Sequence, residues 1–399
     1  MNKKALLIPL LLFSLVGCGN TGDDTITLTV WEDESNIDML ETLADEFVAS
    51  YKRDYPLAPN IKIKFVEQSE KSAIEKLSTV ASTGNGPDIL AITHDTISSS
   101  VKSGLIDEAY YSYELKERMS DGALNAVTIN NKIYGYPITA ESMTLMYNKS
   151  MLSSSDVKSF SSLKASGKTI GLDMQVDGAY YTFGFNNDSV LFGADGKEKG
   201  NVKLDTDKAV SNWTSFINNY TDAVVSMTPE TSISLLSSGT IAGVISSPFL
   251  YNDVIDALGE SNVGLATLPT IDGETLRPFS GYKAYVVNRY CENPALAHAL
   301  ANFLTSDDAQ TWRLSQKSYL PVAKEYTADM NEFLRNDTNL QVFKTSLDNS
   351  ITMPNIEQMA NFWKPMNNAV NALWNKKDAG VTSAEVKAIL SEANQAILK

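Results

Sequence analysis

Hydrophobic and polar residues follow strand-like and helix-like patterns in alternation after residue 24. The expected strands are residues 25–31, 61–66 and 88–93; the first two show alternating apolar positions and the third is a short apolar run. The expected helices lie between these strands, and the second of them covers residues 72–81. Such an alternation of strand and helix is typical of a mostly parallel sheet with helices on both faces.

The pattern begins again near residue 148, which predicts a second α/β lobe. Its expected strands are residues 169–173, 240–246, 262–268 and 281–288, and its expected helices are residues 206–220 and 229–237. Two further strands, 133–138 and 143–147, precede this part of the chain. The chain has 399 residues, of which 43% are hydrophobic and 20% charged, so it is long enough for two domains with ample cores.

A helix is expected over residues 354–374, with one continuous apolar stripe. The stripe consists of Met359, Phe362, Met366, Val370 and Leu373. Trp363 falls at the edge of this stripe, where a tryptophan can pack half in the core and half against a ligand. Pro365 is expected to distort this part of the helix.

The first residues of the chain read as a secretory signal. Lys3 and Lys4 precede an apolar run of about twelve residues, shorter than the roughly 20 that a spanning helix needs, so a retained membrane helix is the weaker interpretation. The small residues before Cys18 resemble a bacterial lipobox, which implies cleavage before this cysteine and diacylation of its sulfur. We expect a signal peptide at residues 1–17, a tether at 18–24 and a lipid-anchored protein outside the cell membrane. An ordinary signal peptide with an incidental cysteine is the alternative.

The net charge bounds the kinds of partner. It is −15 for the whole chain and becomes more negative when Lys3 and Lys4 are removed. This charge argues against nucleic acid and anionic lipid surfaces, and fits a neutral or cationic small ligand better. Cys18 and Cys291 are the only cysteines, so an intrachain disulfide is impossible if Cys18 carries lipid.

The sequence has few of the residues that catalytic and metal sites commonly use. Its only histidines are His94 and His298, and in the expected helix 294–304 His298 lies opposite the apolar face and should face solvent. A zinc site or a histidine-based triad is not expected, and no G-x-S-x-G motif is present. Gly84 and Gly86 precede a strand, so they indicate a turn and not a phosphate-binding loop. We expect neither a metal nor a cofactor.

Acidic residues are the first group of remaining candidates, and they suit a neutral, polyhydroxylated ligand. Asp95 follows the strand 88–93, and ligands of open α/β sheets collect beyond the carboxyl ends of the strands. Glu141 interrupts an apolar segment, where a buried carboxylate needs a partner; a simple strand-edge acid is the alternative. The acids of residues 32–34 are more typical of a solvated turn, although one of them can reach the same crevice.

Aromatic residues are the second group, because carboxylates accept hydrogen bonds from adjacent sugar hydroxyls while rings cover the C–H faces of a sugar. The candidates are Tyr180, Tyr181, Phe183, Phe249, Tyr251 and Trp363. Core packing is the favoured interpretation for any one of them taken alone.

Five sequence segments appear in a particular order. They are TGNGPDILAITHD, SGLIDE, KIYGYPITAESMTLMYNKSML, LPTIDGETLRPFSGYKAYVVN and ITMPNIEQMANFWKPMNNAVNA. In this order they resemble the maltose/maltodextrin-binding proteins of ABC importers, and the correspondence runs from about Thr25 to the C-terminus. The resemblance implies an α/β, two-lobe fold of the periplasmic-binding-protein type, with a sugar cleft between hinged lobes and closure on the ligand.

The resemblance also implies which residues touch the sugar. By the motif matches, the two carboxylate contacts of the first lobe fall on Asp95 and Glu141. The tyrosine of the second lobe falls on Tyr180, and the stacking tryptophan near the C-terminus falls on Trp363.

Other positions depart from the family pattern. Phe249 stands in place of a tryptophan and keeps an aromatic ring there. Ile92 and Phe183 occupy the places of two further tryptophans, and Thr96 that of a sugar-contacting arginine. The charged contacts of the first loop cannot be placed residue by residue around Glu34, which stays a candidate.

The resemblance assigns residues 25–140 and about 285–328 to lobe 1, and about 141–284 with 329–399 to lobe 2. Crossings are expected near residues 139–144 and 279–285. These features imply a monomeric, lipid-anchored protein that captures an oligosaccharide, with maltose or maltodextrin as the leading ligand, and delivers it to an ABC permease.

Two other functions stay open at this point. One is a surface-anchored glycoside hydrolase that uses paired carboxylates such as Asp95 and Glu141, because this chemistry needs no histidine. The other is a sensor or adhesion lipoprotein that uses the same cleft without a permease.

Overall fold

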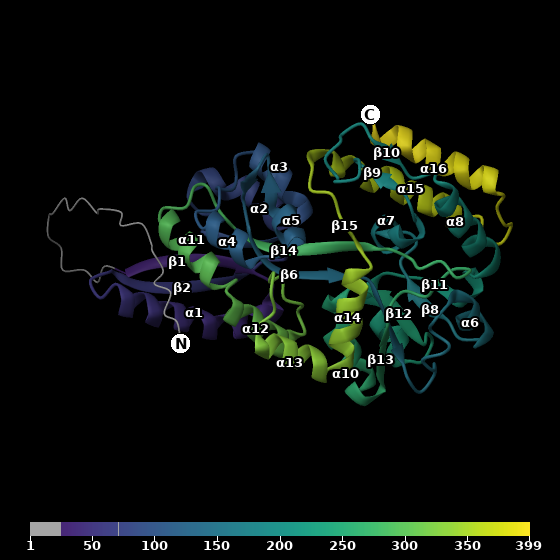
Figure 1. Cartoon of the computed structure of the whole chain (residues 1–399), viewed down its shortest axis with the longest axis horizontal. Coiled ribbons are helices and arrows are strands. Elements are labelled where there is room, and N and C mark those ends of the chain that lie inside the picture. The colour runs from purple at the N-terminus through teal and green to yellow at the C-terminus, as the bar shows by residue number, and fades with distance from the viewer. Residues whose placement is uncertain (1–24, 71) are drawn as a thin grey trace.

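Two α/β lobes lie side by side along the long axis of the molecule (Figure 1). The computed structural model describes residues 25–70 and 72–399. The predicted signal peptide, the predicted tether and the predicted lipid attachment at Cys18 lie outside these residues. Among the helices in the described ranges, none is long and apolar enough to cross a membrane.

The first lobe is built on a six-stranded sheet in the order β15-β14-β3-β1-β2, with β6 paired to β14. Its strands are β1 (Thr25–Glu32), β2 (Asn60–Glu67), β3 (Ile89–Thr93), β6 (Tyr136–Ser142), β14 (Phe279–Val287) and β15 (Ile351–Thr352). β1 is parallel to both β2 and β3, as the alternation of strands and helices predicts. β14 returns from the second lobe and runs antiparallel to β3, so the sheet is mixed.

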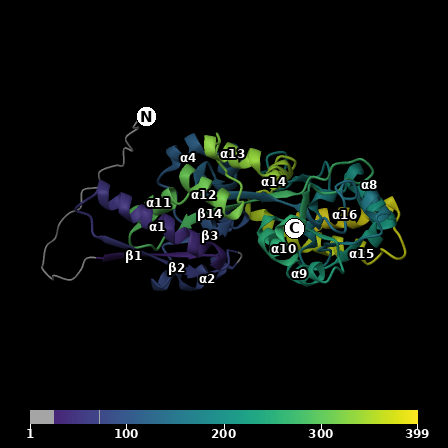
Figure 2. The same cartoon turned by 90° about the horizontal axis from the view of Figure 1, so that it is seen from below.

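Helices cover both faces of this first sheet, and α1 and α2 lie on opposite sides of it (Figures 1 and 2). They are α1 (Glu34–Asp54), α2 (Ala73–Val80), α3 (Ile97–Lys102), α4 (Ser112–Arg118), α5 (Asp121–Val127), α11 (Pro294–Phe303) and α12 (Asp307–Lys317). α1 begins after Asp33, whose side chain accepts a hydrogen bond from the Ser35 amide. Apolar residues three and four positions apart, such as Leu40, Leu43 and Phe47, then bury one face of α1 against the sheet.

The second lobe contains a five-stranded sheet in the order β11-β8-β12-β7-β13. Its strands are β7 (Thr144–Asn148), β8 (Ile170–Leu172), β11 (Val224–Ser226), β12 (Gly243–Ser246) and β13 (Val263–Ala266). The helices that pack around it are α6 (Phe160–Ala165), α7 (Gly178–Tyr181), α8 (Asp207–Asn219), α9 (Pro229–Ser237), α10 (Tyr251–Leu258), α15 (Trp363–Trp374) and α16 (Ser383–Ile397). β8 is parallel to β11 and β12, whereas β7 is antiparallel to β12 and β13.

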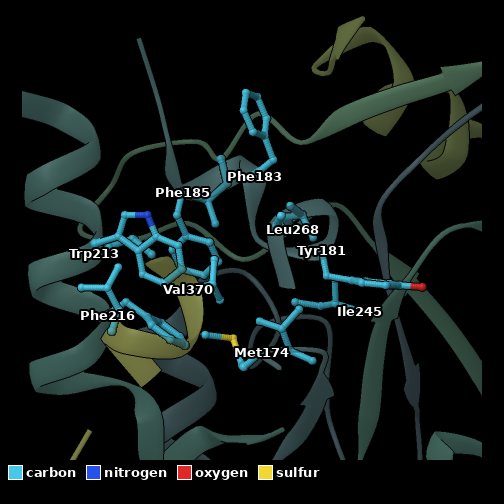
Figure 3. Packing of buried hydrophobic residues seen from close by; sticks show 14 of the residues in the cluster. Met174, Tyr181, Phe183, Phe185, Trp213, Phe216, Ile245, Leu268 and Val370 are labelled. Carbon is cyan, nitrogen blue, oxygen red and sulfur yellow. The ribbon is translucent and has the colours of Figure 1, made fainter. Parts of the chain in front are cut away.

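Buried aromatic rings dominate the core of the second lobe (Figure 3). The rings of Phe185 and Trp213 are stacked with centroids 4.9 Å apart, and Phe216 meets Phe185 edge-on at 4.8 Å. Val370 of α15 and Met174 belong to the same cluster. Burial of each such side chain stabilises the fold by about 1.5–3 kcal/mol, so α15 is held firmly against this lobe.

Strands that cross between the lobes position the junction. β6 of the first sheet continues into β7 of the second with only Met143 between them, and β14 runs back into the first sheet. Helix α14 (Thr338–Asp348), which follows α13 (Ala328–Asn336), contacts β6 on one side and β7 and β13 on the other. β14 spans the predicted lobe boundary near residue 285, since Phe279 packs in the second core while Val287 packs in the first. The lobe boundaries themselves stay a prediction.

Two expected elements are corrected by the structure. The helix expected from residue 354 begins only at Trp363, after a 3₁₀ segment over Glu357–Asn361. Pro365 therefore lies in the first turn of α15, where no intrahelical amide bond is lost, and it does not distort the helix. The strand expected at 133–138 is divided between β5 (Lys132–Ile133), which forms a hairpin with β4 (Thr128–Ile129), and β6, which extends to Ser142 and contains Glu141.

Candidate functional site

Four of the predicted contact residues gather where the two lobes meet. Asp95 lies in a single 3₁₀ turn, His94–Thr96, directly after β3, and Glu141 lies near the end of β6. Tyr180 comes from the short helix α7, and Trp363 is the first residue of α15. Because β3 and β6 belong to the first sheet while α7 and α15 belong to the second lobe, the group draws on both lobes.

Tyr180 is at the centre of this group. Its ring meets that of Trp363 edge-on, with centroids 6.4 Å apart. A Cβ atom placed on Gly281 would lie 3.7 Å from the Tyr180 hydroxyl and 4.0 Å from Cγ of Glu141. Gly281 and Glu141 are directly paired across β14 and β6, so the missing side chain at Gly281 leaves room for both groups.

Electrostatics also connect Tyr180 with the two carboxylates. Burial raises the pKa of Tyr180 well above its usual value, and the negative charges of Glu141 and Asp95 raise it further. The hydroxyl is therefore protonated at neutral pH and can donate a hydrogen bond. The group thus offers carboxylate acceptors, a hydroxyl donor and a partly buried indole ring.

A serine of the second lobe contacts Glu141, and an exposed phenylalanine follows that serine in sequence. The Ser247 hydroxyl donates a hydrogen bond of 3.2 Å to Oε1 of Glu141. Phe249 follows two residues later, in the 3₁₀ segment Pro248–Leu250, and is 39% exposed. A role for Phe249 in binding stays a prediction.

An ion pair that the sequence patterns did not predict lies beside this group. Nζ of Lys283 lies 2.8 Å from Oε1 of Glu70, and both side chains are nearly buried. The ammonium also lies over the ring of Tyr319, 5.7 Å from its centroid. Lys283 had a visible signal, because it is the one charged residue in the apolar strand β14; Glu70 had none, because it lies in a polar segment.

Phe183 and Ile92 lie in the core and do not face the group. Phe183 is 2% exposed and stacks on Phe279 with ring centroids 3.6 Å apart, and Ile92 is fully buried in β3. This burial corrects the expectation that either residue touches a ligand directly. Phe183 instead supports Phe279, whose ring meets Trp363 edge-on at 6.4 Å.

Thr96 and Glu34 have different surroundings. The Thr96 hydroxyl donates to the carbonyl of Thr93 at 2.8 Å, so it is engaged by its own turn, next to Asp95. Glu34 is exposed as the first residue of α1. The structure places neither side chain against Tyr180.

The acidic stretch before α1 is not a solvated turn as expected. Glu32 is 2% exposed and accepts hydrogen bonds from the Tyr285 hydroxyl at 2.6 Å and from Nδ2 of Asn36 at 3.0 Å. Burial raises the pKa of Glu32 in spite of these bonds. Of the three acids only Glu34 is exposed, because Asp33 is half-buried and caps the helix.

The chain matches the family described as bacterial extracellular solute-binding proteins over residues 43–342. It belongs to this family. The expected resemblance is therefore confirmed at the family level.

Relatives and solved structures agree with this assignment. This solute-binding protein is 26% identical to the maltooligosaccharide ABC transporter solute-binding lipoprotein of Streptococcus pneumoniae strain R6, with 98% of the chain and 97% of the relative covered. It is 25% identical to the galactooligosaccharide-binding protein of Bacillus subtilis, with 87% of the chain and 84% of the relative covered. The structure of the maltodextrin binding protein MalE1 from L. casei superposes with a TM-score of 0.80 at 21% identity and covers 94% of this chain and 99% of that one. The predicted two-lobe fold of the periplasmic-binding-protein type is confirmed.

Both histidines of this solute-binding protein are structural. His298 is fully buried, with Nδ1 2.8 Å from the Tyr136 hydroxyl and its ring stacked on Tyr110, so the expectation of a solvent-facing His298 is wrong. Nδ1 of His94 accepts a bond from the Tyr282 amide, and Nε2 lies 3.0 Å from the carbonyl of Met353. Within residues 25–70 and 72–399, no group of three or more acidic, histidine or cysteine side chains is arranged to hold a metal ion.

Proposed function

We propose that this solute-binding protein captures an oligosaccharide of the maltose or maltodextrin class between its lobes and delivers it to an ABC importer. The observation that carries the proposal is the convergence of Asp95, Glu141, Tyr180 and Trp363 from both lobes on one place. The names of several relatives support the ligand class, since they include maltooligosaccharide-binding and maltodextrin-binding proteins.

The proposed contacts are of two kinds, hydrogen bonds to carboxylates and stacking on aromatic rings. The carboxylates of Asp95 and Glu141 accept hydrogen bonds from sugar hydroxyls, each worth about 1.5–3 kcal/mol. Trp363 and Phe249 cover the C–H faces of the sugar rings, which adds apolar contact area. Since these residues come from both lobes, a sugar that touches all of them stabilises the arrangement in which the lobes are closed.

Nothing in the described surroundings of Glu141 favours a glycoside hydrolase. A general acid must hold its proton near neutral pH. Lys283 lies close enough for the charge of Glu141 to raise its pKa, and a neighbouring ammonium stabilises the ionised form of a carboxyl group. We therefore infer a protein that binds sugar without cleaving it.

The proposal also includes attachment to the outer side of the cell membrane. The lipobox-like sequence before Cys18 supports lipid attachment there, and the relatives in Streptococcus pneumoniae are named lipoproteins. A diacyl group gives stable anchoring where a single chain gives only marginal binding. We propose that the anchored protein acts as a monomer that presents its sugar to the permease.

The test is calorimetric titration of maltotriose into the variants Trp363→Ala and Asp95→Ala. Each variant is expected to bind at least about tenfold more weakly, because it loses a platform or a charged acceptor, while thermal unfolding changes little. Trp312→Ala and Asp38→Ala are matched controls, because both side chains are exposed on helices of the first lobe, and they should bind like the wild type. Wild-type affinity in both site variants would refute the site.

A further inference from the structure

A buried cation lies in the strand that crosses between the lobes. β14 has the sequence FSGYKAYVV, and Lys283 is its one charged residue. The side chains of Lys283 and Glu70 are only 11% and 13% exposed, although transferring such charges out of water costs several kcal/mol per ion. A nearly buried ion pair does not by itself show a gain in stability. Its position relative to the candidate site is therefore the better guide to its role.

The strand register places Lys283 on the same face as Glu141. Gly281 of β14 is paired with Glu141 of β6 in an antiparallel ladder, and Lys283 is two residues beyond Gly281. Residues two apart in a strand share a face, so Lys283 and Glu141 are diagonal neighbours, a spacing that long side chains bridge. Gly281, which has no side chain, lies between them in the ladder, and the charges of Lys283 and Glu141 are close enough to interact.

The charges around Lys283 show that its ammonium serves more than one carboxylate. Burial alone would lower the pKa of Lys283, but the charges of Glu70 and Glu141 outweigh this effect and raise the pKa well above its usual value. The ring of Tyr319 lies beside the ammonium, and its hydroxyl donates a hydrogen bond of 3.2 Å to Asn36 of α1. This bond holds the Tyr319 ring next to Lys283. Lys283 is therefore always charged at physiological pH and held from two sides.

We propose that Lys283, held by Glu70, is a positioning residue of the carbohydrate site that keeps the Glu141 carboxylate ionised and in place beside Tyr180. Glu70 follows β2 in the first lobe and anchors the cation, which leaves the ammonium to balance the negative charge of Glu141. The charge of Glu141 also raises the pKa of Tyr180, Tyr181 and Tyr319, and Asp95 acts on Tyr180 as well; none of these four groups supplies a positive charge. This role rests on the proposed function, because it concerns the affinity for the same sugar.

The decisive variant combines Lys283→Met with Glu70→Gln. Removing one partner of a buried pair leaves an uncompensated buried charge and is strongly destabilising, whereas the double variant leaves neither charge of the pair behind. We expect it to unfold near the wild-type temperature but to bind maltotriose about tenfold more weakly at neutral pH. The loss should grow toward about pH 5.5, because a carboxylate without a facing ammonium takes up a proton more readily.

Lys283→Arg is the matched control. It keeps a cation beside Glu141, so it should bind maltotriose within about threefold of the wild type across the same pH range. A double variant with wild-type affinity at every pH would overturn the role and leave the pair purely structural. A loss of affinity that does not change with pH, or that Lys283→Arg shows as well, would also overturn the role. Wild-type protein that binds no oligosaccharide would refute the proposed function itself, and this role with it.

Discussion

At the scale of single residues, the buried imidazole of His298 packs inside the first lobe and makes the stability of the fold depend on pH. Burial lowers the pKa of His298 to about 4, and the nearby Asp107 only partly opposes this shift. The ring is therefore neutral at pH 7, stacked on Tyr110 at 3.9 Å and next to the Tyr136 hydroxyl. A proton on this ring would place a charge in a buried site.

The sign of the resulting pH dependence follows from linkage. His298 binds a proton less readily in the folded state than in the unfolded state, where its pKa is about 6.5. Its contribution is complete above about pH 6.5 and is lost as the pH falls toward about 4, by roughly 3 kcal/mol. His298→Asn is expected to be less stable at pH 7, but the gap to the wild type should shrink at lower pH. Thermal unfolding across this range measures it; a gap that stays constant would contradict the assignment.

Residue-scale prediction from the sequence succeeded where a strand end or a break in apolar pattern marked the position. Asp95 and Glu141 both had such a mark, and the structure brings them toward Tyr180, although their role in binding stays a prediction. His298 failed because a helical wheel shows one face of a helix and cannot show that Tyr110 covers the other. Phe183 failed because aromatic residues suit a core and a platform equally well.

At the scale of elements, β14 joins the two lobes and borders the candidate site. Because Gly281 has no side chain, there is space beside it for the Tyr180 hydroxyl. The backbone of Gly281 is not in the left-handed conformation that would require glycine. An alanine Cβ would lie at ordinary contact distances of 3.7 and 4.0 Å, so space and not backbone geometry decides which residues this position accepts.

Gly281→Val is therefore expected to weaken maltotriose binding at least about tenfold, because an isopropyl group enters the space between Tyr180 and Glu141. Stability should change little, since β-branched residues suit strands. Gly281→Ala serves as the control and should bind within about threefold of the wild type. Calorimetry and thermal unfolding report the two effects separately, and equal affinity in both variants would show that this space is not part of the site.

Strands were the most predictable elements, because alternating or uniformly apolar runs bounded by turns mark them clearly. The strand expected at residues 61–66 is β2, Asn60–Glu67, and that expected at 88–93 is β3, Ile89–Thr93. The start of α15 was missed by nine residues, because the apolar spacing continues through the 3₁₀ segment Glu357–Asn361. The network around Glu32 was missed because Tyr285 and Arg313, which face it, are more than 250 residues away in sequence.

At the scale of the whole molecule, the buried side chains of the described residues form three clusters: one in the first lobe, one in the second, and a third that packs α12 and α14 against the second sheet. The first two clusters allow each lobe to move as a body, while β6, β14 and the segment around β15 are the places where a rotation must be absorbed. The repeated alternation of strands and helices predicted the division into two lobes. It could not predict the strand order of either sheet, in particular the return of β14 from the second lobe to pair with β3 of the first sheet.

A ligand that touches both lobes must favour the arrangement in which its contacts are made together, since a ligand shifts a conformational equilibrium only by its differential affinity. We therefore expect saturating maltotriose to decrease the radius of gyration of the protein measured by small-angle X-ray scattering. Trp363→Ala at the same sugar concentration is the control and should show a smaller decrease, because its site is less occupied. A sugar that binds with full affinity while the radius of gyration stays constant would show that the lobes do not close on it, and that Asp95 of the first lobe and Trp363 of the second hold the ligand in a rigid site.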